Sequence, residues 1–123
     1  MARALRREDI ISVEAYEAER AKRKAEIKRI KAPRRIEVGP FACFYFESFD
    51  TMLYQVQEML HIERGGEEQL ADELAAYCPL VPSGNNLVAT LMLEIADAKK
   101  RYDMLLTLTD IELAAFIAVQ GEE

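Results

Sequence analysis

The residues best equipped for chemistry lie close together between Phe46 and Glu63, in the segment FESFDTMLYQVQEMLHIE. Residues three and four apart share one face of a helix, so the spacing predicts a polar stripe beside an apolar one. The candidate polar site comprises Glu47, Thr51, Tyr54, Gln55 and Glu58, with Glu94 farther along the chain. The sequence contains no phosphate loop, dinucleotide fingerprint or nucleophile elbow, so it assigns no reaction to these side chains.

Glu58 and His61 form a Glu-x-x-His pair, a spacing at which one carboxylate and one imidazole can reach the same ion. Di-iron bundles use this pair twice, whereas His61 is the only histidine here. We favour the simpler interpretation, in which both side chains face solvent or bond to neighbours, and we predict no cofactor. The alternative is an iron or manganese site with Glu58, His61 and Glu94 as its candidate ligands.

Glu94 interrupts the apolar run LVATLMLEI and is expected near the interior of a sheet. Burying an unpaired carboxylate there costs on the order of several kcal/mol, because the charge loses its hydration. Arg34 and Arg35 flank the first predicted strand and are the expected ion-pair partners. A structural salt bridge is favoured over a catalytic role for Glu94.

The N-terminal half of the chain predicts two helices separated by β structure. Ser12 begins a helix over about residues 12–31, which Pro33 ends. The stretch 34–46 predicts either two short strands or one bent strand, with a turn at Gly39-Pro40. Ser48 or Asp50 caps a second helix that Gly65-Gly66 stops.

The C-terminal half predicts a third helix over 67–77, a loop over 78–86 and a central strand over 87–95, although the pattern also allows a buried helix there. Asp97 caps a fourth helix that continues to about Leu106. The tail IELAAFIAVQG predicts a final strand, with a helix as the alternative. This order predicts an α+β fold, a small and mainly antiparallel sheet with about four helices packed on it.

Length and charge predict one domain over residues 1–123, with a basic N-terminal helix at about 12–31 and an acidic α+β body at 34–121. Residues 1–35 hold 12 basic and 6 acidic side chains, whereas residues 36–123 hold 4 basic and 16 acidic ones. We favour a basic helix lying on the acidic body, and nucleic-acid binding is disfavoured. Without a signal peptide, a membrane segment or paired cysteine motifs, the chain is expected in the cytoplasm.

Three blocks of the sequence resemble a bacterial family known only as domain of unknown function 3501. They are LRREDIISVEAYEAER with the later RRIEVGP, then FESFDTMLYQVQEMLHIE, then ELAAYCPLVPSGNNLVATLMLEI. The resemblance covers most of the chain from Leu5 to about Ile95. Positions that match the family pattern include Glu47, Thr51, Tyr54, Gln55, Gln57, Glu58, Met59, Glu63, Pro79, Pro82 and Thr90.

The resemblance implies a small cytoplasmic protein encoded beside rubrerythrin-like and iron–sulfur oxidoreductase proteins. That neighbourhood implies a role in redox or oxidative-stress metabolism. We favour a non-enzymatic accessory or interaction protein with redox partners over an enzyme, and the alternative is a carboxylate-rich metal-binding or small enzymatic site centred on Glu58 and Glu94. Relatives carry arginine where this chain has His61, which argues against a shared metal site. They also continue past a point like Gly121, so an open sheet edge that allows homo-oligomers is expected here.

Overall fold

The computed structural model describes residues 3–107, 115 and 117 of the chain. They contain four α-helices and one three-stranded sheet, so the predicted α+β class is confirmed. The chain divides into two compact units, Met1–Leu93 and Glu94–Glu123. The predicted final strand over 111–121 lies outside the described residues, apart from Ala115 and Ile117. The prediction of a single domain stays a prediction.

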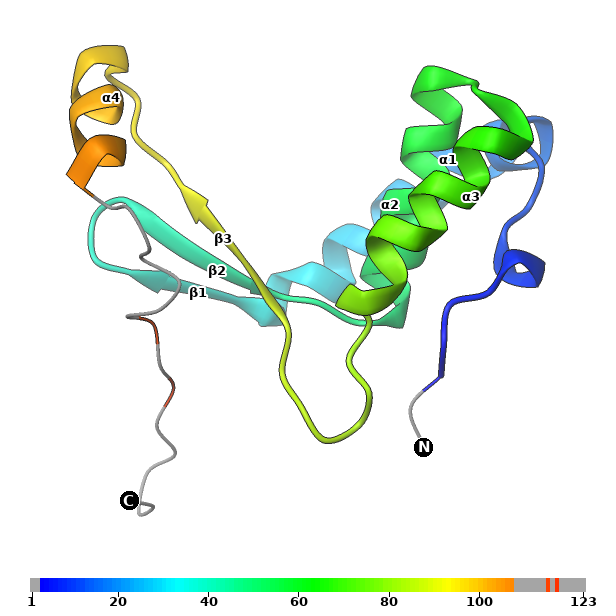
Figure 1. Cartoon of the computed structure of the whole chain (residues 1–123), viewed down its shortest axis with the longest axis horizontal. Helices are drawn as coiled ribbons and strands as arrows, with labels where there is room; N and C mark the ends of the chain where they lie inside the picture. Colours follow the sequence, from blue (N-terminus) through cyan, green and yellow to red (C-terminus); the bar gives the residue numbers. More distant parts are fainter. Residues whose placement is uncertain (1–2, 108–114, 116, 118–123) are drawn as a thin grey trace. The chain divides into compact units, whose positions relative to one another are not determined.

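The first unit contains three of the helices and the whole sheet (Figure 1). Its elements are α1 (Val13–Lys31), β1 (Arg35–Val38), β2 (Ala42–Phe46), α2 (Phe49–Glu63), α3 (Gly66–Tyr77) and β3 (Ala89–Leu93). Short 3-10 turns at Arg7–Asp9, Ala32–Arg34 and Cys78–Leu80 join them. The second unit contributes α4 (Ala98–Thr107), which begins after Asp97 as predicted.

The helix boundaries follow from local capping chemistry. The Ser12 hydroxyl accepts a hydrogen bond from the Ala15 backbone N–H at 3.1 Å, and Ser48 rather than Asp50 caps α2. At the other end of α2 the left-handed residue is Arg64, with φ 53°, and Gly66 follows with φ 73°. The predicted glycine stop is therefore displaced by one residue, because Arg64 itself takes the left-handed conformation that closes the helix.

The described core forms among the helices and the N-terminal segment. Leu5, Met52, Val56, Leu60 and Leu70 make the buried cluster, and α2 supplies three of its five members. The spacing of these three residues matches the apolar stripe read from the sequence. Helix α2 is thus the central element of this cluster, with α1 and α3 packed beside it (Figure 1).

The sheet is antiparallel with the strand order β1-β2-β3. The stretch 34–46 forms two strands, and Gly39 in the turn between them has φ 66°, a conformation that favours glycine. The prediction of a central strand over 87–95 was wrong in position, because β2 is central and β3 lies at the edge of the described sheet. Strand β3 is also shorter than predicted, since the five residues of β2 offer pairing partners only to Ala89–Leu93.

No helix within the described ranges is both long enough and apolar enough to cross a membrane.

Candidate functional site

The polar residues that the sequence singled out are mostly on α2 or directly before it. Because Met52, Val56 and Leu60 face the core, the polar side chains must leave the helix in other directions. The structure brings Glu47 and Thr51 together but directs Gln55 and Glu58 to different neighbours. Apart from the Glu47–Thr51 pair, these residues of α2 therefore contact different partners.

Glu47 joins the end of β2 to α2 and β3. One of its carboxylate oxygens accepts a hydrogen bond from the Thr51 hydroxyl at 2.8 Å, and the other accepts from the Thr90 hydroxyl at 2.5 Å. Only 9% of Glu47 is exposed, so the two hydroxyl donors offset much of the cost of burying this carboxylate. The backbone supports the same junction, because the Glu47 N–H donates to the Val88 carbonyl at 2.8 Å.

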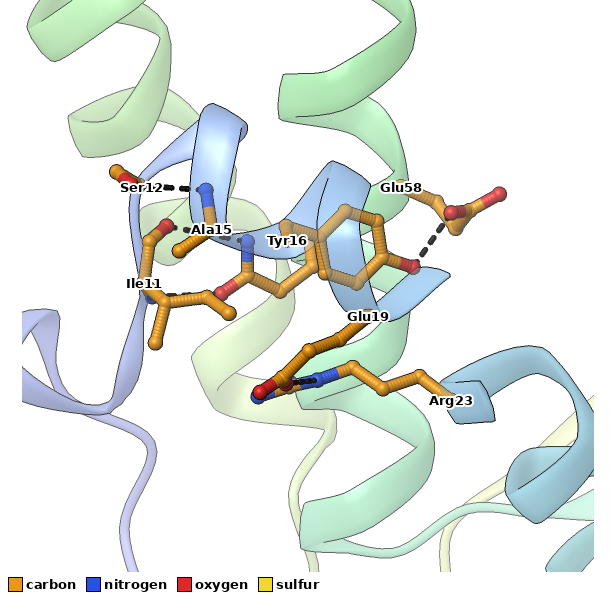
Figure 2. Close-up of polar contacts among 8 residues, drawn as sticks. Ile11, Ser12, Ala15, Tyr16, Glu19, Arg23 and Glu58 are labelled. Carbon is orange, nitrogen blue, oxygen red and sulfur yellow. Dashed lines mark hydrogen bonds and ion pairs between the residues drawn. The ribbon is translucent and has the colours of Figure 1, made fainter. Parts of the chain in front are cut away.

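Glu58 is held by two residues of α1, Tyr16 and Arg20. The Tyr16 hydroxyl donates to Glu58 Oε2 at 2.5 Å, and Figure 2 shows the tyrosine ring pointing from α1 toward this carboxylate. Arg20 donates to both oxygens, from Nε at 3.1 Å and from Nη2 at 3.0 Å. This two-pronged contact is the strong, geometrically fixed form of an arginine–carboxylate pair.

The electrostatics of this triad follow from its geometry. Hydrogen bonds from Arg20 lower the pKa of Glu58, against a smaller opposing effect of burial, so the carboxylate is anionic at neutral pH. Burial raises the pKa of Tyr16 well above its ordinary value, and its hydrogen bond to Glu58 adds to the rise. A neutral phenol therefore donates to a charged carboxylate that is already paired, so Glu58 is a poor proton acceptor.

Tyr54 and Gln55 continue the polar face with weaker contacts. The ammonium group of Lys31 lies 5.8 Å from the Tyr54 ring centroid, within the range of a cation–π contact. Burial also raises the pKa of Tyr54, and the nearby Glu58 charge adds to this. The Gln55 side-chain amide donates to the Tyr77 hydroxyl at 3.4 Å, which connects α2 to α3.

Gln57 was not among the predicted site residues, although it matches the family pattern. It is 1% exposed, and its side-chain amide forms two hydrogen bonds with the backbone of Ile11. The Ile11 N–H donates to Oε1 at 2.8 Å, and Nε2 donates to the Ile11 carbonyl at 3.3 Å. A glutamine directly beside the apolar Val56 was the available sequence signal, but nothing local identified a partner 46 residues away.

The remaining predicted residues lie around the sheet and in the second unit. The Arg34 guanidinium donates to the Glu47 backbone carbonyl at 3.5 Å. Arg35 donates from Nε to the Cys43 sulfur at 3.0 Å and pairs with Glu37 at 3.1 Å. Glu94 is exposed and begins the second unit, one residue beyond β3. Its predicted pairing with Arg34 or Arg35 stays a prediction.

His61 lies near Tyr16, with the two rings in an edge contact and their centroids 6.0 Å apart. Its Nδ1 atom is buried and has no hydrogen-bond partner within the described structure. Among the described residues, no group of three or more His, Cys, Asp or Glu side chains could hold a metal ion. The two oxygens of Glu58 already accept bonds from Arg20 and Tyr16, so a metal at Glu58 would have to displace them. The iron or manganese site stays a prediction.

The fold and these contacts define a small α+β protein in which polar side chains of the central helix connect the elements around it. The chain belongs to the family described as "Protein of unknown function (DUF3501)", whose model matches residues 4–123. This confirms the resemblance read from the three sequence blocks.

The chain is similar to a novel protein of unknown function from Burkholderia pseudomallei K96243, with 37% sequence identity and a TM-score of 0.82. The match covers 86% of this chain and 60% of that one, so this chain spans less than two thirds of the longer protein. A search of curated proteins found no match.

Proposed function

We propose that this chain is a non-enzymatic interaction protein of the cytoplasm, and that its partner docks on one face of the three-stranded sheet. The polar residues of α2 support a structural role for that helix, because the carboxylates of Glu47 and Glu58 bond to other parts of the fold. The observation that carries the proposal is the composition and exposure of the sheet.

One face of the sheet is wholly apolar. Side chains alternate between the two faces of each strand, and the pairing register therefore assigns every strand residue to a face. We call the first face the apolar sheet face, and it consists of Ile36, Val38, Ala42, Phe44, Phe46, Ala89, Leu91 and Leu93. The opposite face carries Arg35, Glu37, Cys43, Tyr45, Thr90 and Met92.

The apolar sheet face is only partly covered in the described structure, because three of its residues are exposed and the other five are half-buried. None of its eight side chains is buried, and Ile36 and Val38 are 47% and 50% exposed. Removing apolar surface from water contributes about 25 cal/mol per Å², so covering a contiguous patch of this kind drives association. Exposed contiguous apolar patches mark interaction sites more often than inert surface.

The class of partner is proposed from the family resemblance. Its neighbourhood of rubrerythrin-like and iron–sulfur oxidoreductase proteins supports a redox protein as the occupant of this face. In this role the chain contributes a docking surface, and the partner supplies the redox centre.

The test compares two adjacent residues of β3 that lie on opposite faces. Leu91→Asp places a charge on the apolar sheet face, whereas Met92→Asp places the same charge on the other face at a residue that is 48% exposed. Binding to the purified neighbouring oxidoreductases is measured by calorimetry, with and without reductant. We expect Leu91→Asp to weaken binding at least about tenfold, since an interface must desolvate the new charge, and Met92→Asp to bind like the parent.

Two results would contradict the proposal in different ways. Equal binding by both variants would show that the apolar sheet face is not the docking surface. The absence of any complex with the parent chain, in either redox state, would refute the redox partner class.

A further inference from the structure

A cavity of about 300 Å³ lies where the end of β2, the start of α2 and the loop before β3 meet. All of its lining residues belong to the first unit. A volume of this size is at the lower end of the range for small-molecule sites, which are mostly apolar with a few well-placed polar groups. The apolar part of the wall comes from Phe46, Phe49, Val81, Pro82, Leu87 and Val88.

Two arginines, Arg3 and Arg34, also line this cavity. The Arg3 guanidinium lies 4.1 Å from the Phe49 ring centroid and pairs with Asp9, so its charge is already offset. Arg34 is half-buried, and its one described hydrogen bond runs from Nη1 to the Glu47 carbonyl at 3.5 Å, the outer limit for such a bond. A guanidinium carries five N–H donors, so Arg34 has donors left for a ligand.

The acidic residue on this wall, Glu47, directs its carboxylate to other partners. The two carboxylate oxygens accept hydrogen bonds from the Thr51 and Thr90 hydroxyls. Arg34 contacts only the backbone carbonyl of Glu47, so its contacts in the described structure include no carboxylate. A half-buried cation beside an apolar wall attracts an anion more strongly than an exposed one does, because less water screens the two charges.

We propose that this cavity binds a small monocarboxylate with a compact apolar body, such as an aryl group or a branched alkyl chain. The planar fork of Arg34 matches the two oxygens of a carboxylate, and the apolar body contacts the rest of the wall. A phosphate dianion fits less well, because Arg3, the other cation of the described wall, already pairs with Asp9. The site needs no protein partner, so its test is independent of docking on the apolar sheet face.

Hydrocinnamate is the probe, because it joins one carboxylate to a phenyl ring through a short chain. An NMR titration of the full chain should give saturable shifts at Leu87 and Val88, with a Kd of about 1 mM or below. Hydrocinnamamide has the same body without the charge and should bind at least about tenfold more weakly. The absence of shifts at these residues in excess hydrocinnamate would overturn the proposal. Equal binding of the amide would overturn the carboxylate as the recognised group.

Substitution of Arg34 tests the assigned residue. Arg34→Gln removes the charge but keeps a side-chain donor, and it should weaken hydrocinnamate binding at least about tenfold. Arg29→Gln is the matched control, because Arg29 is an exposed arginine of α1 that does not line the cavity, and this variant should bind like the parent. Equal binding by Arg34→Gln and the parent would overturn the assignment.

A second variant tests the apolar wall without threatening the core. Leu87 is 68% exposed, so Leu87→Ala should keep the fold, and circular dichroism melts of all the variants check this point. Its loss shortens the wall that contacts the apolar body, so hydrocinnamate binding should weaken by about threefold. Parent-like binding by Leu87→Ala, with no shift at Val88, would place the probe outside this cavity and overturn the proposal.

Discussion

At the scale of single residues, Glu58 shows how a side chain suited to catalysis is used in the fold. Its side chain is 13% exposed, and its carboxylate accepts hydrogen bonds from Tyr16 and Arg20, which both come from α1. Charge-assisted hydrogen bonds of this kind contribute about 1.5–3 kcal/mol when well shielded. The Arg20 side chain is 37% exposed, so solvent reduces the contribution of the pair.

We predict that Glu58→Gln lowers the free energy of unfolding by about 1–2 kcal/mol at neutral pH. The pKa of Glu58 is lowered in the folded chain, so its stabilising effect is present above the unfolded pKa and is lost as pH falls through the folded pKa. The difference between parent and variant should therefore shrink in acid. Urea titrations at a series of pH values measure it, with Glu68→Gln on the exposed surface of α3 as the control. Parallel pH profiles for parent and Glu58→Gln would contradict the assigned role.

At the scale of elements, separate hydrogen bonds connect α2 to each of several neighbouring elements. Glu47 and Thr51 connect its start to β3, Glu58 connects it to α1, and Gln57 connects it to the segment before α1. Burial of Met52, Val56 and Leu60 supplies the attraction between elements, but it is non-directional. The hydrogen bonds select one arrangement because a misaligned helix would leave buried polar groups unpaired.

Gln57→Leu should destabilise the fold by about 2–3 kcal/mol, because it leaves the half-buried backbone N–H and C=O of Ile11 without their partners. Exchange of the Ile11 amide hydrogen should also accelerate, which native-state hydrogen exchange detects. Gln55→Leu is the matched control, since Gln55 forms a single long contact with Tyr77 at 3.4 Å and should lose less than about 1 kcal/mol. Equal costs for the two variants would show that the Ile11 contact has no special weight.

At the scale of the whole molecule, every described member of the buried cluster lies in the first unit. Its members run from Leu5 to Leu70, and the partly buried residues around it extend only to Val81. The basic α1 packs along α2. The Arg20–Glu58 ion pair joins the basic N-terminal region to the acidic body. The described residues of this cluster therefore all precede Glu94.

A fragment that ends at Leu93 should consequently fold alone and unfold in one cooperative transition. Its free energy of unfolding should lie within about 1 kcal/mol of the full chain, a difference of about 4–8 °C in melting temperature. Thermal melts followed by circular dichroism compare the two. A gradual, non-cooperative melt of the fragment would show that residues after Leu93 are needed for the core.

The sequence by itself determined what depends on neighbours along the chain. Ser12 and Ser48 cap their helices through backbone groups three residues away, Gly39 makes the hairpin turn, and the apolar spacing of α2 sets its buried face. Alternation along β2 likewise puts Phe44 and Phe46 on the face opposite to Cys43 and Tyr45. These features act over short distances, so local pattern was sufficient.

Only the tertiary structure decided where the polar side chains of α2 find their partners. Tyr16 and Glu58 are 42 residues apart, Glu47 and Thr90 are 43 apart, and Ile11 and Gln57 are 46 apart. The local sequence around a polar side chain on a helix does not distinguish a catalytic group from a buried group that hydrogen-bonds two elements together. Both roles need the same donors and acceptors. The tertiary structure also decides how exposed the apolar sheet face is, because this exposure depends on which elements pack against the sheet.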